Sequence, residues 1–102
     1  MINPHIESIG HPIHTIQGHK KLLKEGVILL DVRSLPEFAE GHAKTAILLP
    51  MEDISFFKDV IKSWKRPVLT CSSTGKRSRK AMYALRKEGI PAFDGGAWET
   101  WK

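Results

Sequence analysis

The sequence predicts an α/β fold, a three-layer α/β/α domain with a mostly parallel sheet of about five strands and helices on both faces. Two observations predict it. Short apolar runs alternate along the chain with segments of helical periodicity, and no internal repeat or long linker separates them. In addition, 102 residues with 41% hydrophobic and 26% charged side chains are enough for one core, so residues 1–102 are expected to form a single domain.

Four apolar runs predict the strands. Residues 27–32 and 67–71 lack polar alternation, which is typical of strands buried on both faces. Residues 46–49, stopped by Pro50, and residues 90–93, stopped by Asp94-Gly95-Gly96, predict two more. A short edge strand over residues 6–9 completes the expected sheet.

Helices are expected between these strands. Between residues 54 and 64, apolar side chains recur at helical spacing: Ile54, Phe57, Ile61 and Trp64. The same spacing follows residue 77: Ser78, Ala81, Met82 and Leu85. Gly89 stands where a glycine that ends a helix is expected. A first helix is expected over residues 16–24, with Thr15 as its N-cap and Gly26 beyond its end.

Composition excludes several classes of protein. The lone Cys71 cannot form an internal disulfide, and no apolar run approaches the roughly 18 residues of a membrane span. Residues 1–15 lack the apolar core of a signal peptide, so a cytoplasmic protein without membrane association is expected. The net charge is +5, and most of this excess surrounds Cys71, in Lys62, Lys65, Arg66, Lys76, Arg77, Arg79, Lys80, Arg86 and Lys87.

The segment that follows the strand at residues 67–71 is the candidate site. Cys71 is followed by small, hydroxylated and basic residues: Ser72, Ser73, Thr74, Gly75, Lys76 and Arg77. Such a loop lets backbone N–H groups point inward, and with the next helix N-terminus it forms an anion-binding nest. Helix dipole, backbone donors and cations are expected to lower the pKa of Cys71 below about 8.5 and make it a nucleophile. The alternative is a small buried hydrophobe that ends a strand before an ordinary turn.

Several motifs in order make the chain resemble a single-domain rhodanese of the rhodanese-like sulfurtransferase superfamily. Residues 29–42, LLDVRSLPEFAEGH, resemble the family's Leu-Asp-Val-Arg, Glu-Phe and Gly-His signature. The Cys71 loop and the closing Gly95-Gly96-Ala97-Trp98 fall where the family has its active-site loop and its last Gly-Gly turn. The resemblance covers nearly the whole chain.

The resemblance implies sulfur transfer. Cys71 would take the outer sulfur of a small anionic donor such as thiosulfate as a persulfide, and a thiol or protein acceptor would remove it. Asp31, Arg33 and Glu37 would organise the loops beneath the site. No metal and no organic cofactor are expected. A nucleic-acid partner is not expected either, because no stacking platform or nucleic-acid motif is present.

One departure leaves other functions open. Many single-domain sulfurtransferases place the arginine five positions after the cysteine, whereas Arg77 is six positions after Cys71. The longer spacing resembles cell-cycle dual-specificity phosphatases and arsenate reductases of this fold, although these usually have His where Thr70 stands. In such an enzyme, Arg77 would clamp an oxyanion. The third possibility is a non-catalytic module or sulfur carrier that docks a partner through its basic face.

Overall fold

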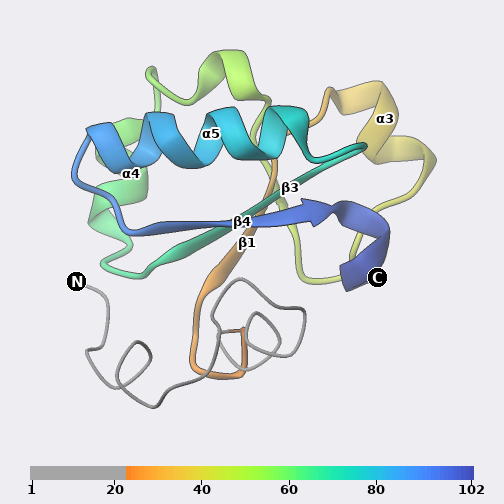
Figure 1. Cartoon of the computed structure of the whole chain (residues 1–102), viewed down its shortest axis with the longest axis horizontal. Helices are drawn as coiled ribbons and strands as arrows, with labels where there is room; N and C mark the ends of the chain where they lie inside the picture. Colours follow the sequence, from red (N-terminus) through yellow and green to blue (C-terminus); the bar gives the residue numbers. More distant parts are fainter. Residues whose placement is uncertain (1–22) are drawn as a thin grey trace.

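The computed structural model describes residues 23–102 (Figure 1). It contains a four-stranded, all-parallel sheet in the order β2-β1-β3-β4. The strands are β1 (Ile28–Asp31), β2 (Ile47–Leu48), β3 (Val68–Ser72) and β4 (Ala92–Ala97). The helices are α3 (Leu35–Glu40), α4 (Lys58–Ser63) and α5 (Lys76–Lys87), with 3-10 turns η1 (Met51–Asp53) and η2 (Trp98–Trp101).

The predicted fold class is confirmed, with four strands rather than about five. The edge strand expected at residues 6–9 lies outside the described residues. So does the helix expected over residues 16–24, apart from its last two residues, which are helical. Among the described helices, none combines the length and apolar character that a bilayer crossing requires.

Two apolar clusters lie on opposite faces of the sheet, since successive strand residues point to opposite sides. Leu30 and Val68 pack in the cluster that α4 and α5 cover, on the side seen above the sheet in Figure 1. Leu29 and Leu69 pack in the other cluster, against the tryptophans of η2. All five residues of β3 are buried, as expected for a central strand covered on both faces.

The helix expected over residues 54–64 is shorter in the structure. The chain forms η1 and a tight turn before α4 begins at Lys58, because the amides of Phe56 and Phe57 both donate to the carbonyl of Asp53. This turn rotates Phe57 away from the apolar side of the helix and leaves it 40% exposed. Ile54 and Ile61 are buried as the spacing predicts.

Helix α5 matches its pattern fully, since the four residues at helical spacing are all buried: Ser78, Ala81, Met82 and Leu85. Gly89 follows its end with a φ of +79°, and the amide of Ile90 donates to the carbonyl of Leu85. This is the glycine-dependent ending that the sequence predicts.

Two strands extend further than their apolar runs. β4 continues from Phe93 through Asp94-Gly95-Gly96 to Ala97, where the sequence predicted a stop. Gly95 makes this possible because a Cβ atom there would lie 2.5 Å from the Thr70 carbonyl oxygen. β3 runs to Ser72, which pairs with Ala97 after an irregularity in register. The last residue of β3 is therefore Ser72, and not Cys71 as the sequence predicted.

Candidate functional site

The loop between β3 and α5 closes around the side chain of Ser72. The amides of Gly75 and Ser78 both donate to Ser72 Oγ, each at 3.1 Å. Gly75 caps α5 in the left-handed region at φ +94°, which turns the backbone so that these amides face inward. Ser72 has no exposed surface. The inward-pointing N–H groups that the sequence predicted are present, and they meet at Ser72.

Cys71 points to the opposite face of the sheet, because it precedes Ser72 on the same strand. Its side chain packs in the apolar cluster with Val27, Leu29, Ala43, Leu69 and Phe93. It has no exposed surface. Cys71 thus lies among the packing residues of the sheet, and within residues 23–102 its sulfur has no hydrogen bond to the loop.

Burial, and after it the nearby Asp31 carboxylate, raise the pKa of the Cys71 thiol to about 12, against an opposing effect of Arg33. The prediction that the loop lowers this pKa is therefore wrong for the described structure. The physical reason is that the amide donors reach Ser72, while Cys71 is left with desolvation and a neighbouring negative charge.

Arg77, expected to hold an oxyanion, is engaged by a carboxylate of the protein itself. Its two terminal nitrogens donate to the two oxygens of Glu37 at 2.7 and 2.8 Å. The hydroxyl of Ser73 donates to Glu37 Oε2 at 2.9 Å and accepts from Arg77 at 3.1 Å. Glu37 and Arg77 remain about one-third exposed. The guanidinium fork is thereby occupied by an internal anion.

Glu37 also holds the start of α3. Its carboxylate accepts from the amide and hydroxyl of Ser34, each at 3.0 Å, while Ser34 Oγ caps the amide of Glu37. This capping box joins α3 to the loop through one side chain. Hydrogen bonding from Arg77, followed by that from Ser34, holds the pKa of Glu37 far below its usual range, although burial opposes this.

Asp31 and Arg33 form a buried pair beneath the loops. Arg33 donates to the Asp31 carboxylate through Nε and Nη2, at 3.0 and 2.8 Å, and the Arg33 amide donates to it at 3.1 Å. Arg33 also donates to the Gly41 carbonyl at 2.7 Å and stacks 4.4 Å from the centre of the Trp98 ring. The hydrogen bond to Asp31 is the main reason that the pKa of Arg33 is raised.

A chain of polar side chains that was not predicted from the sequence lies behind the loop. Thr70 Oγ1 lies 2.8 Å from Ser78 Oγ, and Ser78 donates to Asp94 at 2.6 Å. Asp94 then accepts from the amide of Gly96 at 2.9 Å. These contacts join β3, α5 and β4 directly under Ser72. Only Ser78, buried at a helix position otherwise held by apolar residues, could have indicated this chain in advance.

The remaining loop residues lie at its surface. Thr74 and Lys76 are exposed, and no hydrogen bond of theirs to another side chain is present within the described residues. The seven sequence-predicted loop residues are contiguous, so the structure does bring them together. Their side chains nevertheless divide between the buried Cys71 and Ser72, the Glu37-bound Ser73 and Arg77, and the exposed tip.

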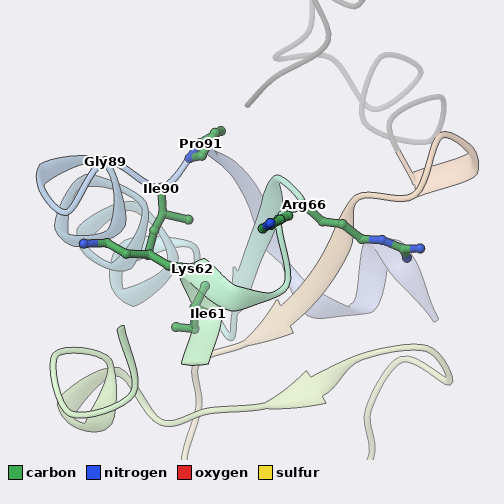
Figure 2. A pocket seen from close by; sticks show the side chains of 7 residues that line it. Ile61, Lys62, Arg66, Gly89, Ile90 and Pro91 are labelled. Carbon is green, nitrogen blue, oxygen red and sulfur yellow. The ribbon is translucent and has the colours of Figure 1, made fainter. Parts of the chain in front are cut away.

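A separate pocket of about 210 Å³ lies at the other end of the strands, before β3 and β4 begin. Figure 2 shows that the side chains of Lys62 and Arg66 extend in opposite directions from it. Consistent with this view, Arg66 lies beside Gly26, where a Cβ atom would be 3.9 Å from Nη1. Lys62 and Arg66 therefore do not point toward one common position in this pocket.

The Glu37–Arg77 pair makes a testable contribution to stability at acid pH. Because the folded pKa of Glu37 is lowered, its stabilisation is present above the unfolded pKa of about 4.3 and is lost as the pH falls below it. We expect Glu37→Gln to lose stability at neutral pH and to flatten the acid dependence of the unfolding free energy. The difference should be on the order of 1 kcal/mol, since solvent screens the pair.

Urea unfolding followed by tryptophan fluorescence between pH 7 and pH 3 measures this difference. Glu40→Gln, an exposed acid on the same helix, is the matched control and should leave the pH dependence close to that of the wild type. Equal behaviour of the two variants would contradict a stabilising role for the Glu37–Arg77 pair.

The sheet order, the cradle (the loop of residues 72–78, whose amides meet at Ser72 Oγ) and the buried Asp31–Arg33 pair define an α/β domain. Residues 15–102 match the family model of the rhodanese-like domain, so the chain belongs to the rhodanese-like domain family. A rhodanese-like domain protein from Staphylococcus aureus is 29% identical, with a TM-score of 0.67 over 85% of this chain and 87% of that one.

Two further solved structures share the fold. A human single-domain sulfurtransferase is 24% identical, with a TM-score of 0.64 over 90% of this chain and 96% of that one. A protein from Staphylococcus saprophyticus is 21% identical, with a TM-score of 0.71 over 85% of this chain and 89% of that one. In all three structures the match covers most of the other chain, so this fold makes up nearly the whole of each.

Proposed function

We propose that this rhodanese-like domain is a non-catalytic binding module that docks a partner protein through its basic face. The observation that carries the proposal is the orientation of residues 71 and 72. The amide donors of the loop converge on Ser72 Oγ, whereas the Cys71 thiol is buried on the opposite face of the sheet. A hydroxyl at the cradle is a far weaker nucleophile than a thiolate, and no general base contacts it within the described residues.

The spacing of the loop agrees with this proposal. Arg77 is five positions after Ser72, which is the distance that sulfurtransferases of this superfamily commonly have between cysteine and arginine. The apparent extra residue between Cys71 and Arg77 thus disappears when Ser72 is taken as the loop's first position. In this alignment, serine stands at the position of the nucleophile.

The occupied donors also support a binding role. Two backbone amides of the loop donate hydrogen bonds to Ser72, and the guanidinium of Arg77 donates to Glu37. The donors that could stabilise an added oxyanion therefore already have partners. An oxyanion-converting enzyme of the phosphatase or arsenate reductase class would have to break the bidentate Glu37–Arg77 pair before each turnover. The Glu37–Arg77 pair therefore disfavours both phosphatase and arsenate reductase activity.

Sulfur transfer through Cys71 is the second candidate, favoured by family membership and by the similar fold of the human sulfurtransferase. In that reaction the Cys71 thiolate attacks the outer sulfur of thiosulfate, and the sulfur–sulfur bond breaks with its electron pair leaving on sulfite. Cyanide or a thiol then removes the outer sulfur and regenerates the thiolate. This route requires the cluster around Cys71 to open, because the thiol has no exposed surface.

Intact-protein mass spectrometry after incubation with thiosulfate tests the proposal. We expect no gain of a sulfur atom on the wild-type chain and no thiocyanate when cyanide is added. Aryl phosphate hydrolysis should also remain at the level of buffer. A cyanide-sensitive gain of one sulfur, mapped by peptide analysis to Cys71, would replace the binding proposal with the second candidate.

A further inference from the structure

The outer face of α5 is rich in positive charge. Helix α5 contains six cationic residues and no acidic one: Lys76, Arg77, Arg79, Lys80, Arg86 and Lys87. Two of the six have acidic neighbours, since Arg77 pairs with Glu37 and Arg79 lies 3.6 Å from Asp94. Within the described residues, Lys76, Lys80 and Lys87 have no ion pair. The helix therefore exposes uncompensated positive charge to any partner.

A hollow with an apolar floor interrupts this charge. Lys80, Tyr83, Ala84 and Lys87 recur at helical spacing on one stripe, opposite the buried residues of α5, and with Arg86 they line a shallow surface hollow. Tyr83 is 58% exposed. The Nε of Arg86 donates to the Ala92 carbonyl at 2.8 Å, which anchors this side chain at the edge of the hollow. The exposed ring of Tyr83 thus lines the hollow together with two lysines that have no ion pair in the described part of the chain and with the hydrogen-bonded Arg86.

We propose that this stripe of α5 binds an acidic protein segment that places one apolar side chain against Tyr83 and Ala84. Unpaired cations select carboxylates by charge complementarity, and the apolar floor accepts an aliphatic or aromatic side chain between them. The stripe from residue 80 to residue 87 is about 10 Å long, which suits a short peptide. Tyr83 is the one aromatic residue of α5, so this helix lacks the row of stacking side chains that single-stranded nucleic acid uses.

This inference deepens the proposed function, on which it rests for the binding role of the domain, and it names the surface and the class of partner. Its test is separate from the sulfur-transfer assays. The binding of an acidic peptide to α5 and the modification of Cys71 are measured on different observables, so either proposal can fail without the other.

The probe is a fluorescein-labelled 12-residue peptide rich in glutamate with one central leucine, titrated with the whole domain and followed by fluorescence anisotropy. We expect saturable binding that weakens as salt rises from 50 to 300 mM. Lys80→Glu combined with Lys87→Glu should weaken binding about tenfold or more. Lys24→Glu combined with Lys44→Glu makes the same change in net charge at two exposed lysines outside α5, and should weaken binding less than about threefold.

Tyr83→Ala tests the apolar contact separately, because this substitution does not change the net charge. It should reduce affinity for the leucine peptide by about three- to tenfold, and have little effect on a peptide with alanine in place of leucine. Three results would overturn the proposal: equal losses in the two lysine pairs, no coupling between Tyr83 and the leucine, or tighter α5-dependent binding of a labelled DNA duplex. Circular dichroism of each variant establishes that the fold is retained.

Discussion

Ser72→Cys is expected to create a reactive thiol where the wild-type chain has none. The introduced sulfur would take the position of Ser72 Oγ and receive the amides of Gly75 and Ser78. Hydrogen bonds to a thiolate lower its pKa, so this thiol should titrate below about 8.5, in contrast to Cys71 at about 12. Positions 71 and 72 both have no exposed surface, so a thiol at either one reacts only after a local opening. Position 72 lies under the surface loop and Cys71 lies in the apolar cluster, so the variant should react with iodoacetamide at neutral pH about tenfold faster than the wild type or more.

The same variant should gain cyanide-sensitive sulfur from thiosulfate, detected by mass and by thiocyanate release. Two matched controls locate the effect. Ser72→Cys in a Cys71→Ala background should keep the whole gain, because Cys71 only packs in the core. Thr74→Cys places a thiol at the exposed tip of the same loop, away from the two converging amides, and should show little of it.

A gain that disappears in the Cys71→Ala background would show that Cys71 is the nucleophile. It would contradict the conclusion that the loop amides meet at the side chain of residue 72. An introduced thiol that titrates above 9 and takes no sulfur would contradict the view that the loop stabilises an anion at this position.

Gly95→Ala is expected to cause a large loss of stability. A Cβ atom at this position would lie 2.5 Å from the Thr70 carbonyl oxygen and 3.1 Å from both Leu69 Cγ and Trp101 Nε1. The first of these is backbone in the central strand and cannot move without breaking sheet pairing. We expect a loss of about 3 kcal/mol or more, or failure to fold, because overpacking against backbone is poorly relieved.

Thermal unfolding measured by circular dichroism tests this expectation, with a fall in Tm of more than about 12 °C for a domain of this size. Gly89→Ala is the control, since Gly89 also needs its backbone freedom at φ +79° but a Cβ atom there meets no heavy atom within 4 Å. Its cost should be only about 1 kcal/mol from left-handed strain. If Gly95→Ala cost no more than Gly89→Ala, close approach of β4 to β3 would not be the reason for this glycine.

The parts of the fold that depend on local pattern could be predicted from the sequence. The apolar runs at residues 27–32 and 67–71 form the buried strands β1 and β3, and the spacing from Ser78 to Leu85 gives the buried face of α5. Family membership was also predictable, because the residue 29–42 signature depends only on residue types in order. Phe57 was misplaced because a turn between η1 and α4 changes the rotation of the chain, which periodicity does not contain.

The lone cysteine and the basic, hydroxyl-rich loop were both evident from the sequence, but which side chain the loop surrounds was not. Successive side chains of a strand point to opposite faces of the sheet. Because β3 ends one residue later than predicted, Cys71 faces the core and Ser72 faces the loop. The end of β3 is fixed by its pairing with Ala97 across an irregular register and by the close approach of Gly95. These are contacts between segments more than 20 residues apart. They place Ser72, and not Cys71, under the converging amides.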